Sequence, residues 1–199
     1  MNRNVSIRKI RTSIEKKLDE KRFEHSLGVA FTAANLAALY GENPKDAEIA
    51  GLLHDCAKCI TDDKKISICQ KHHIPVSDSE LRNPYLLHAK VGGFLAMNKY
   101  QITDKNIVNS IIYHTTGRPN MSMLEKIIYV SDFIEPSRKN LANMFEVRKL
   151  VYTDIDQALI LILEDTLQYL HATQEEVDPL TQKTFDFYTK QLALKAEEN

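Results

Sequence analysis

Two side chains that commonly ligate metals stand next to each other in this sequence, His54 and Asp55, within the stretch Gly51–Lys58. Neighbouring residues on a regular helix point about 100° apart, so only a helix end, where the backbone changes course, would aim both at one object. Asn43 and Pro44 are typical of an N-cap and a first-turn proline, and the helix that they begin would end close to the pair. Taken alone, the pair is equally well explained as a buried histidine satisfied by its neighbouring aspartate.

Other histidines and one aspartate interrupt apolar stretches elsewhere in the chain. These residues are His25, His88, His114 and Asp132. Burial of a polar side chain is costly without a partner. With the His54-Asp55 pair, these make five interruptions on five predicted helices, which are hard to explain as independent core residues. One polar centre in a helical bundle explains them together, as imidazoles and carboxylates around a divalent cation. The remaining histidines lie at polar helix ends and are predicted to be exposed or structural: His72, His73 and His171.

The elements that would position these residues are all helices. Nearly every segment has helical periodicity and none alternates like a strand, which predicts an all-α fold. The expected helices of the first half lie at about 7–18, 22–40 and 44–55, from 62 to before 75, and from 83–84 to 95. The next two begin at a cap, one running from Thr103 to 113 and the other from a capping box of Ser122 and Glu125 to 134. The last three lie at about 141–152, at 155–170 and through 185–192. Gly92 and Gly93 predict close packing against a neighbour. We expect one compact domain over residues 1–199, with the ligand-bearing core at about 22–140 and the C-terminal helices at 141–199 packed on it.

The composition excludes several classes of protein. The chain has 199 residues, 43% of them hydrophobic, and a net charge of -1, which is enough for one good core and argues against a general binder of nucleic-acid polymers. No apolar run approaches the ~20 residues of a membrane span, and no signal-peptide pattern is visible at the start, so we expect a cytoplasmic protein without a membrane partner. Both a monomer and a homodimer remain open.

The three cysteines are predicted to be reduced, structural thiols. Cys56, Cys59 and Cys69 are too few and too clustered for a disulfide framework. The first two have CxxC spacing, but no second pair follows to complete a structural zinc site.

The order His25, His54-Asp55, Asp132 resembles the H…HD…D signature of the HD-domain metal-dependent phosphohydrolases. The additional histidines between the doublet and the last aspartate resemble those of members with an enlarged site. The resemblance runs from about Arg22 to the C-terminal helices, which is nearly the whole chain.

Longer stretches resemble one branch of that family, the YqeK-type proteins. These stretches are Leu53–Lys58, Tyr113–Arg118 and Ser131–Arg138. Members of the branch are bacterial hydrolases that split diadenosine tetraphosphate symmetrically into two ADP. The resemblance therefore implies a helical HD-domain bundle with a buried metal centre and this dinucleotide as its substrate.

The resemblance also implies roles for individual residues. It places a metal, often iron in this family, on His25, His54, Asp55 and Asp132. It places His88 and His114 toward a second metal or the phosphates, so one or two ions are expected. It makes Asp55 and Lys58 the expected catalytic residues. The positions expected around the nucleotide are Arg22, Asp55, Cys56, Ala57, Lys58, His88, His114, Gly117, Arg118 and Arg138.

Elementary chemistry agrees with these roles. Hydrolysis of a polyphosphate needs cations and hydrogen-bond donors around the phosphoryl oxygens, and a metal would activate water near neutral pH. Lys58 follows the doublet within a turn, and Arg118 and Arg138 each follow a segment with an expected ligand. Solvated surface cations are the alternative explanation of all three residues.

The predicted function is therefore hydrolysis of diadenosine tetraphosphate into two ADP by metal-activated water. A broader nucleotide phosphatase or phosphodiesterase is the nearest alternative, and a non-catalytic nucleotide-binding HD module is another. A redox or zinc module around Cys56 and Cys59 is a third. No base-binding motif is readable in the sequence, so the position of the cut along the polyphosphate rests on the resemblance.

Overall fold

The computed structural model describes residues 6–139 and 143–197, and within these ranges it consists of helices without a strand. The all-α prediction is confirmed. The elements are α1 (Ile7–Glu15), α2 (Glu20–Leu39), α3 (Pro44–Leu53), α4 (Asp62–Lys71), α5 (Asp78–Arg82), the 3-10 turn η1 (Pro84–Leu86), α6 (Leu87–Asn98), α7 (Lys105–Ile112), α8 (Met123–Ile134), α9 (Met144–Leu150), α10 (Ile155–Ala172) and α11 (Pro179–Glu197).

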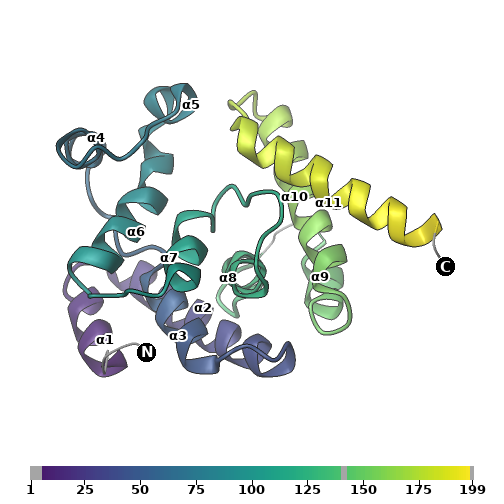
Figure 1. Ribbon diagram of the computed structural model, residues 1–199, viewed down its shortest axis with the longest axis horizontal. Coiled ribbons are helices and arrows are strands. Elements are labelled where there is room, and N and C mark those ends of the chain that lie inside the picture. The colour runs from purple at the N-terminus through teal and green to yellow at the C-terminus, as the bar shows by residue number, and fades with distance from the viewer. Residues whose placement is uncertain (1–5, 140–142, 198–199) are drawn as a thin grey trace.

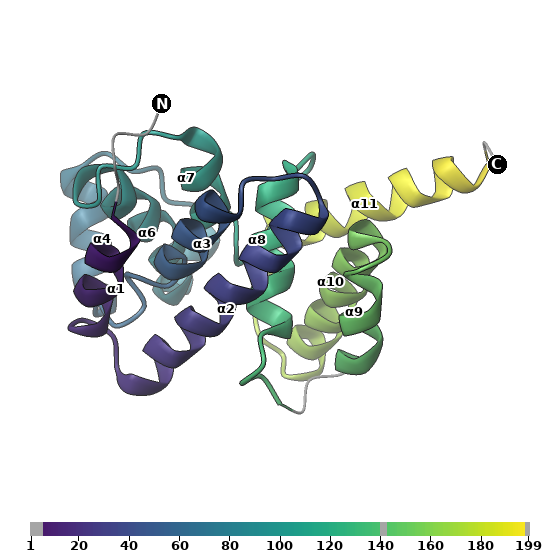
Figure 2. The same ribbon diagram turned by 90° about the horizontal axis from the view of Figure 1, so that it is seen from below.

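Helix α8 stands between two groups of helices (Figure 1). One group contains α1 and α3–α7, and the other contains α9–α11. The long helix α2 packs along α3 and α8, and Figure 2 shows it crossing from the first group toward the second. Since α8 also contacts α7 and α10, side chains on α8 can face both groups at once.

Side-chain caps fix where several helices begin. The predicted caps at Asn43 and at the Ser122–Glu125 box are present, with Asn43 Oδ1 accepting from the amide of Lys45 at 2.9 Å. The prediction that Thr103 caps α7 is wrong by one residue. Asp104 is the N-cap, and its carboxylate accepts from the amide of Asn106 at 2.8 Å. Aspartate is the better N-cap of the two residue types, which explains the shift.

The region before α6 differs most from prediction. The short helix α5 was not expected, although Ser77 and Glu80 form a complete capping box at its start. Pro84 opens a 3-10 turn instead of an α-helix, and α6 begins only at Leu87. The expected helix at 141–152 is observed as α9, and residues 140–142 lie outside the described ranges. Five residues are too few to show a helical period, so a cap was the only local signal for α5.

Close packing of α6 on α7 is confirmed at the glycine pair. A Cβ atom on Gly93 would lie 2.5 Å from Cγ1 of Ile112, and one on Gly92 would lie 3.2 Å from Cγ2 of Ile111. Side chains at these positions would force the two helices apart. The absence of Cβ atoms there brings α6 against the end of α7, which positions the histidines that these helices carry.

The cysteines behave as predicted. All three are free, with Cys56 and Cys69 buried and Cys59 exposed. Burial raises the pKa of the Cys56 thiol to about 12. A thiol of this kind stays protonated at neutral pH, which argues against a redox or zinc module at this pair. In residues 6–139 and 143–197 we find no helix with the length and apolar character that a bilayer crossing demands.

Candidate metal centre

Five helices bring the six expected ligands to one point inside the bundle. His25 comes from α2, His88 from α6 and Asp132 from α8. His54 and Asp55 follow directly on α3, and His114 lies two residues beyond α7. All are buried except Asp132, which is partly exposed. Because α3 ends at Leu53, the neighbouring His54 and Asp55 can face the same point, as predicted from the sequence.

We call the first part of this centre the acidic half (His25, His54 and Asp132). His25 Nε2 lies 3.0 Å from Asp132 Oδ1 and 3.3 Å from His54 Nε2. Asp55 Oδ2 lies 3.5 Å from His54 Nε2 and 4.0 Å from His25 Nε2. Two imidazole nitrogens and two carboxylate oxygens therefore surround one small space.

We call the second part the histidine half (His88 and His114). The Nε2 atoms of these two residues are 3.2 Å apart. Asp55 Oδ1 lies 3.3 Å from His88 Nε2 and 3.5 Å from His114 Nε2. The carboxylate of Asp55 therefore joins the two halves, with one oxygen facing each.

Backbone carbonyls fix the tautomers of three of the histidines. The Nδ1 atoms of His54, His88 and His114 lie 2.7, 2.6 and 2.7 Å from the carbonyl oxygens of Gly51, Tyr85 and Ile111, respectively. A carbonyl oxygen can only accept, so each Nδ1 carries the proton and each Nε2 presents a lone pair to the centre. Facing lone pairs without a proton between them repel each other unless a cation lies among them. The arrangement fits a bound metal, because metal-ligating histidines typically donate their other N–H in this way.

A buried carboxylate orients the fourth histidine. His25 Nδ1 lies 3.0 Å from Oε1 of Glu135, which is itself buried and accepts from the amide and the hydroxyl of Ser137. Burial works to raise the pKa of Glu135, but hydrogen bonds from Ser137 and His25 hold that pKa below its ordinary value. A Cβ atom on Gly28 would lie 2.5 Å from Oε2 of Glu135, so the glycine leaves room for this carboxylate.

Sequence reasoning missed Glu135 as a site residue. The predicted helix ended at 134, and Glu135 just beyond it was given no role. The available signal was its position one helical turn after Asp132, which places both carboxylates on the same side of α8.

The electrostatics of the centre favour the ligand forms of its side chains. Burial alone would raise the pKa of Asp55, but the neighbouring His54, His114 and Lys58 lower it well below its usual range. Burial alone would raise the pKa of Asp132, but hydrogen bonding to His25, together with the neighbouring His54 and Arg138, holds it well below its ordinary value. Burial and the charge of Lys58 lower the pKa of His88 well below its ordinary value. Ionised carboxylates and neutral imidazoles are the forms that bind metals.

One buried carboxylate oxygen shows most clearly that the centre fits a cation. Asp55 Oδ1 is fully buried and accepts no hydrogen bond from the described residues. Its nearest neighbours in the centre are the two unprotonated Nε2 atoms of His88 and His114 and, at 3.5 Å, Lys58 Nζ. A buried ionised oxygen without a partner is costly, and a cation would satisfy it together with both nitrogens.

The family comparison agrees with this geometry. The model of the HD domain family matches residues 22–137. This chain is an HD-domain protein. The resemblance inferred from the order of its histidines and aspartates is thereby confirmed, and membership of the HD family implies a divalent metal at the centre just described.

Similar proteins cover nearly the whole length of this HD-domain chain. A Bacillus subtilis protein named bis(5'-nucleosyl)-tetraphosphatase, symmetrical, is 39% identical over 87% of this chain and 92% of its own. A protein of the same name from Halalkalibacterium halodurans is 36% identical over 85% of this chain and 89% of its own. A crystal structure from Clostridium acetobutylicum, described as a predicted HD superfamily hydrolase involved in NAD metabolism, has 40% identity and a TM-score of 0.90, and covers 94% of this chain and 98% of that one.

Three cations surround the HD centre at positions expected from the sequence. Arg22 donates to Asp55 Oδ2 at 2.7 Å, and Arg138 donates to Asp132 Oδ1 at 2.8 Å and to its carbonyl oxygen at 3.1 Å. Lys58 Nζ donates to His88 Nε2 at 3.0 Å. All three groups therefore contact a ligand side chain directly.

Four other residues expected around the nucleotide do not reach the centre. Cys56 is buried with its sulfur 3.8 Å from the carbonyl oxygen of Gly92, and Ala57 is buried in a small apolar cluster. Arg118 forms two hydrogen bonds of 2.8 Å to Glu125, the capping-box residue of α8. Gly117 lies in the loop between α7 and α8, where it adopts a φ of 63°. No hydrogen bond or ion pair joins these four described residues to the six expected ligands, and their contact with the nucleotide stays a prediction.

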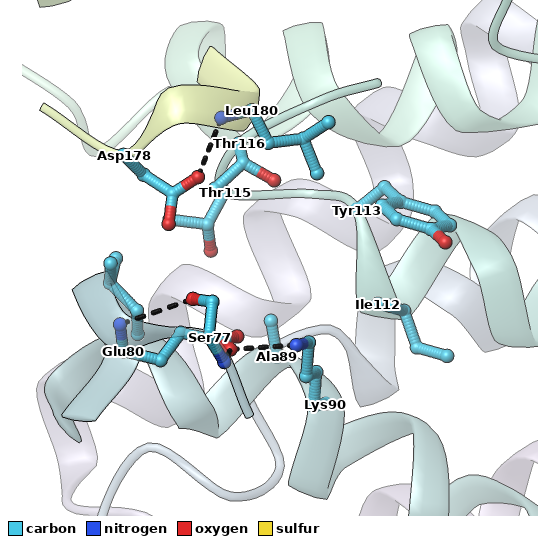
Figure 3. A pocket seen from close by; sticks show the side chains of 11 residues that line it. Ser77, Glu80, Ala89, Lys90, Ile112, Tyr113, Thr115, Thr116, Asp178 and Leu180 are labelled. Atoms are coloured by element: carbon cyan, nitrogen blue, oxygen red, sulfur yellow. Dashed lines mark hydrogen bonds and ion pairs between the residues drawn. The ribbon is translucent and has the colours of Figure 1, made fainter. Parts of the chain in front are cut away.

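Two pockets open beside the HD centre. The first, of about 120 Å³, lies between α5, α6, the end of α7 and the start of α11. Figure 3 shows Glu80 and Lys90 paired on one of its walls and Asp178 bonded to the amide of Leu180 on another. The second pocket is a groove of about 240 Å³ between α8 and α10. Thr115 lines both, and its hydroxyl lies 3.1 Å from His114 Nε2.

Proposed function

We propose that this protein hydrolyses diadenosine tetraphosphate symmetrically, giving two molecules of ADP. The observation that carries the proposal is the carboxylate of Asp55, which shares its two oxygens between the halves of a buried His/Asp centre ringed by cations. The names of the two relatives described above support this substrate class.

The proposed ligands of a metal are His25, His54, Asp55 and Asp132. His88 and His114 would join Asp55 around a second ion. Imidazole nitrogens mixed with carboxylate oxygens suit iron among other divalent metals, and we propose iron as the ion in the cell. A bound divalent metal polarises phosphoryl oxygens and supplies hydroxide from water near neutral pH.

The three cations have a proposed role in binding the phosphates. Arg22, Lys58 and Arg138 now contact the ligand side chains, and once those are neutralised by metal, their donors can turn to phosphate oxygens. The planar guanidinium groups can bind phosphate with two parallel hydrogen bonds. Lys58 lies 3.5 Å from Asp55 Oδ1, so it would stand beside a phosphoryl group held at the centre. We assign Lys58 to charge stabilisation on that group and Asp55 to orientation of the attacking water.

The reaction balances as a single hydrolysis. Water adds to one of the two central phosphorus atoms, and the bond from that atom to the central bridging oxygen breaks. The bridging oxygen leaves with the other ADP, stabilised by a nearby cation as negative charge develops on it.

The pocket of Figure 3 is the proposed site of one nucleoside. Leu86, Ile112 and Leu180 supply apolar surface for a base, and Glu80 and Asp178 supply acceptors for hydroxyl or amino groups. Thr115 joins this pocket to the metal centre, so a nucleotide lying in it would bring its phosphates to the histidine half.

Product analysis tests the proposed function. The purified protein, loaded with ferrous iron, is incubated with diadenosine tetraphosphate in ¹⁸O-labelled water, and the products are separated by anion exchange and weighed by mass spectrometry. We expect ADP as the sole product, with one labelled oxygen in half of the ADP molecules. The same preparation treated with a chelator is the control.

Other product patterns would overturn the proposal. AMP with ATP would indicate an asymmetric cut, and free phosphate from many nucleotides would indicate a broad phosphatase. Binding of the dinucleotide without turnover in the metal-loaded protein would indicate a non-catalytic module.

A further inference from the structure

We propose that the groove between α8 and α10 binds the second nucleoside of the substrate, so that the metal centre lies between two nucleoside sites. This inference rests on the proposed function and adds a binding site to it. The groove has a volume of about 240 Å³ and is lined by Tyr129, Phe133, Ile162 and Thr166, with His114 and Arg138 at its end toward the centre.

The symmetry of the proposed reaction places one nucleoside on each side of the metal centre. A cut at the central bridge leaves two phosphates and one nucleoside on each side of the broken bond. The pocket of Figure 3 accounts for one side only. Thr115 lies on the walls of both cavities, and its hydroxyl is 3.1 and 3.3 Å from the Nε2 atoms of His114 and His88. A tetraphosphate that lies across the metal centre can therefore place one of its two nucleosides in each cavity.

The groove has the chemistry that a flat base needs. The Phe133 ring is partly exposed, and Ile162 lines the groove beside it. Aromatic and aliphatic surfaces bind a nucleobase by stacking and apolar contact. The ring of Tyr129 is buried among neighbouring core residues and gives the groove a rigid floor.

The inner end of the groove carries a cation for the adjacent phosphate. The guanidinium of Arg138 is held by Asp132 Oδ1 at 2.8 Å, and its side chain remains 37% exposed. Arginine has five donor hydrogens, so these contacts leave donors that can face the groove. Arg138 would then bind the phosphate next to the second nucleoside, on the acidic half, while Lys58 faces the histidine half.

Thr166 allows the groove to be filled without disturbing other elements. Its hydroxyl donates to the carbonyl of Ile162 in its own helix at 2.8 Å, and the side chain lines the groove. Thr166→Trp should therefore block the groove and keep the fold. Glu164→Trp, on an exposed position of the same helix, is the matched control. The melting temperature of each variant checks that it is folded.

Calorimetric titration of the metal-loaded protein with ADP tests the site directly. We expect two ADP per chain for the wild type and for E164W, and one for T166W. The analogue of diadenosine tetraphosphate with a methylene group at the central bridge should bind once to each, but at least about tenfold more weakly to T166W, because one stacked base is lost. Hydrolysis should show a rise in KM of the same size in T166W, and none in E164W.

Phe133→Leu provides a second variant that keeps the apolar volume but removes the ring. We expect it to raise KM and to leave kcat close to that of the wild type. One ADP per chain in the wild type, or T166W with unchanged KM and ADP stoichiometry, would overturn the second site while hydrolysis to ADP keeps the proposed function intact. Absence of both binding and hydrolysis in the metal-loaded wild type would overturn the two together.

Discussion

The acidic half and the histidine half of the centre share Asp55, but different parts of the fold hold them in place. In the acidic half, His25 is oriented by the side chain of Glu135, 110 residues away in the chain. In the histidine half, His88 and His114 are oriented by carbonyl groups three residues earlier in their own segments. The acidic half therefore depends on tertiary packing for His25, although the carbonyl of Gly51 orients its other histidine, His54, locally. The histidine half depends on local helix geometry alone.

The two halves also differ in charge. Beyond the shared Asp55, Asp132 and Glu135 add two carboxylates to the acidic half. Arg22 and Arg138 pair with Asp55 and Asp132 there, so these added charges balance. The histidine half has neutral imidazoles with Lys58 Nζ 3.0 Å from His88. The acidic half is thus the less positive of the two, which gives it the stronger attraction for a cation. We therefore expect the acidic half to hold its metal alone and the histidine half to fill when phosphate supplies further negative charge.

Asp55→Ala gives the largest expected effect, because it removes the only ligand common to both halves. Metal catalysis contributes several kcal/mol, so we expect a loss of about 10³-fold or more in kcat/KM. Metal content, measured by mass spectrometry, should fall in both halves. Asp156→Ala, at the start of α10 in an ion pair with Lys126, is the control and should retain activity. Full activity of D55A in a clean preparation would refute the assigned centre.

Glu135→Gln should separate the two halves. The variant keeps the volume of the side chain but removes the charge that orients His25, and such a loss typically weakens metal affinity by about 10–100-fold. Metal titration followed by calorimetry should show the loss in the stronger site only. Glu125→Gln is the matched control, since Glu125 is an equally buried glutamate in the first turn of α8, whereas Glu135 follows its last residue. Glu125 caps α8 and pairs with Arg118. E125Q should lower the melting temperature and leave metal affinity unchanged, whereas equal metal affinities in E135Q and the wild type would contradict the dependence on tertiary packing.

The same contrast explains which parts of the site the sequence could predict. Each of the six ligands interrupts an apolar stripe, so the cost of burying it is visible from its immediate neighbours. Glu135 lies beside Pro136 at a helix end, where an exposed polar residue is ordinary, and its partner His25 is far away in the chain. Local sequence therefore predicted the residues of the polar centre, but the packing of α2 on α8 decides what orients His25.

Arg118 has a contact that the sequence did not predict. Its position after His114 favours a phosphate contact, and the structure pairs it with Glu125. The capping box that includes Glu125 was predicted correctly, but a cap says nothing about which other donor its carboxylate will accept. The short helix α5 was missed because only its capping box, and no periodicity, marked it.

The pH dependence of stability gives the smallest expected effect and tests the histidine half. The pKa of His88 is lowered in the folded protein, so its imidazole stays neutral there. In the unfolded chain the same imidazole takes up a proton below about pH 6.5. The contribution of His88 is therefore complete above that pH and is lost as the pH falls, with a slope of at most one proton. The lowered pKa values of Asp55 and Asp132 change the free energy of unfolding only below about pH 4. The contribution of His88 can therefore be measured apart from theirs.

Urea unfolding of the metal-free protein in chelator, at pH 7.5 and at pH 5.5, measures this contribution. We expect the free energy of unfolding to fall less between pH 7.5 and pH 5.5 in His88→Gln than in the wild type. The variant has no imidazole at position 88 that can take up a proton on unfolding. His72→Gln is the control, since His72 is exposed and folding does not take it out of water. The same loss in H88Q as in the wild type would mean that His88 is not held neutral by its buried position beside Lys58, and the contrast between the two halves would then rest on Glu135 alone.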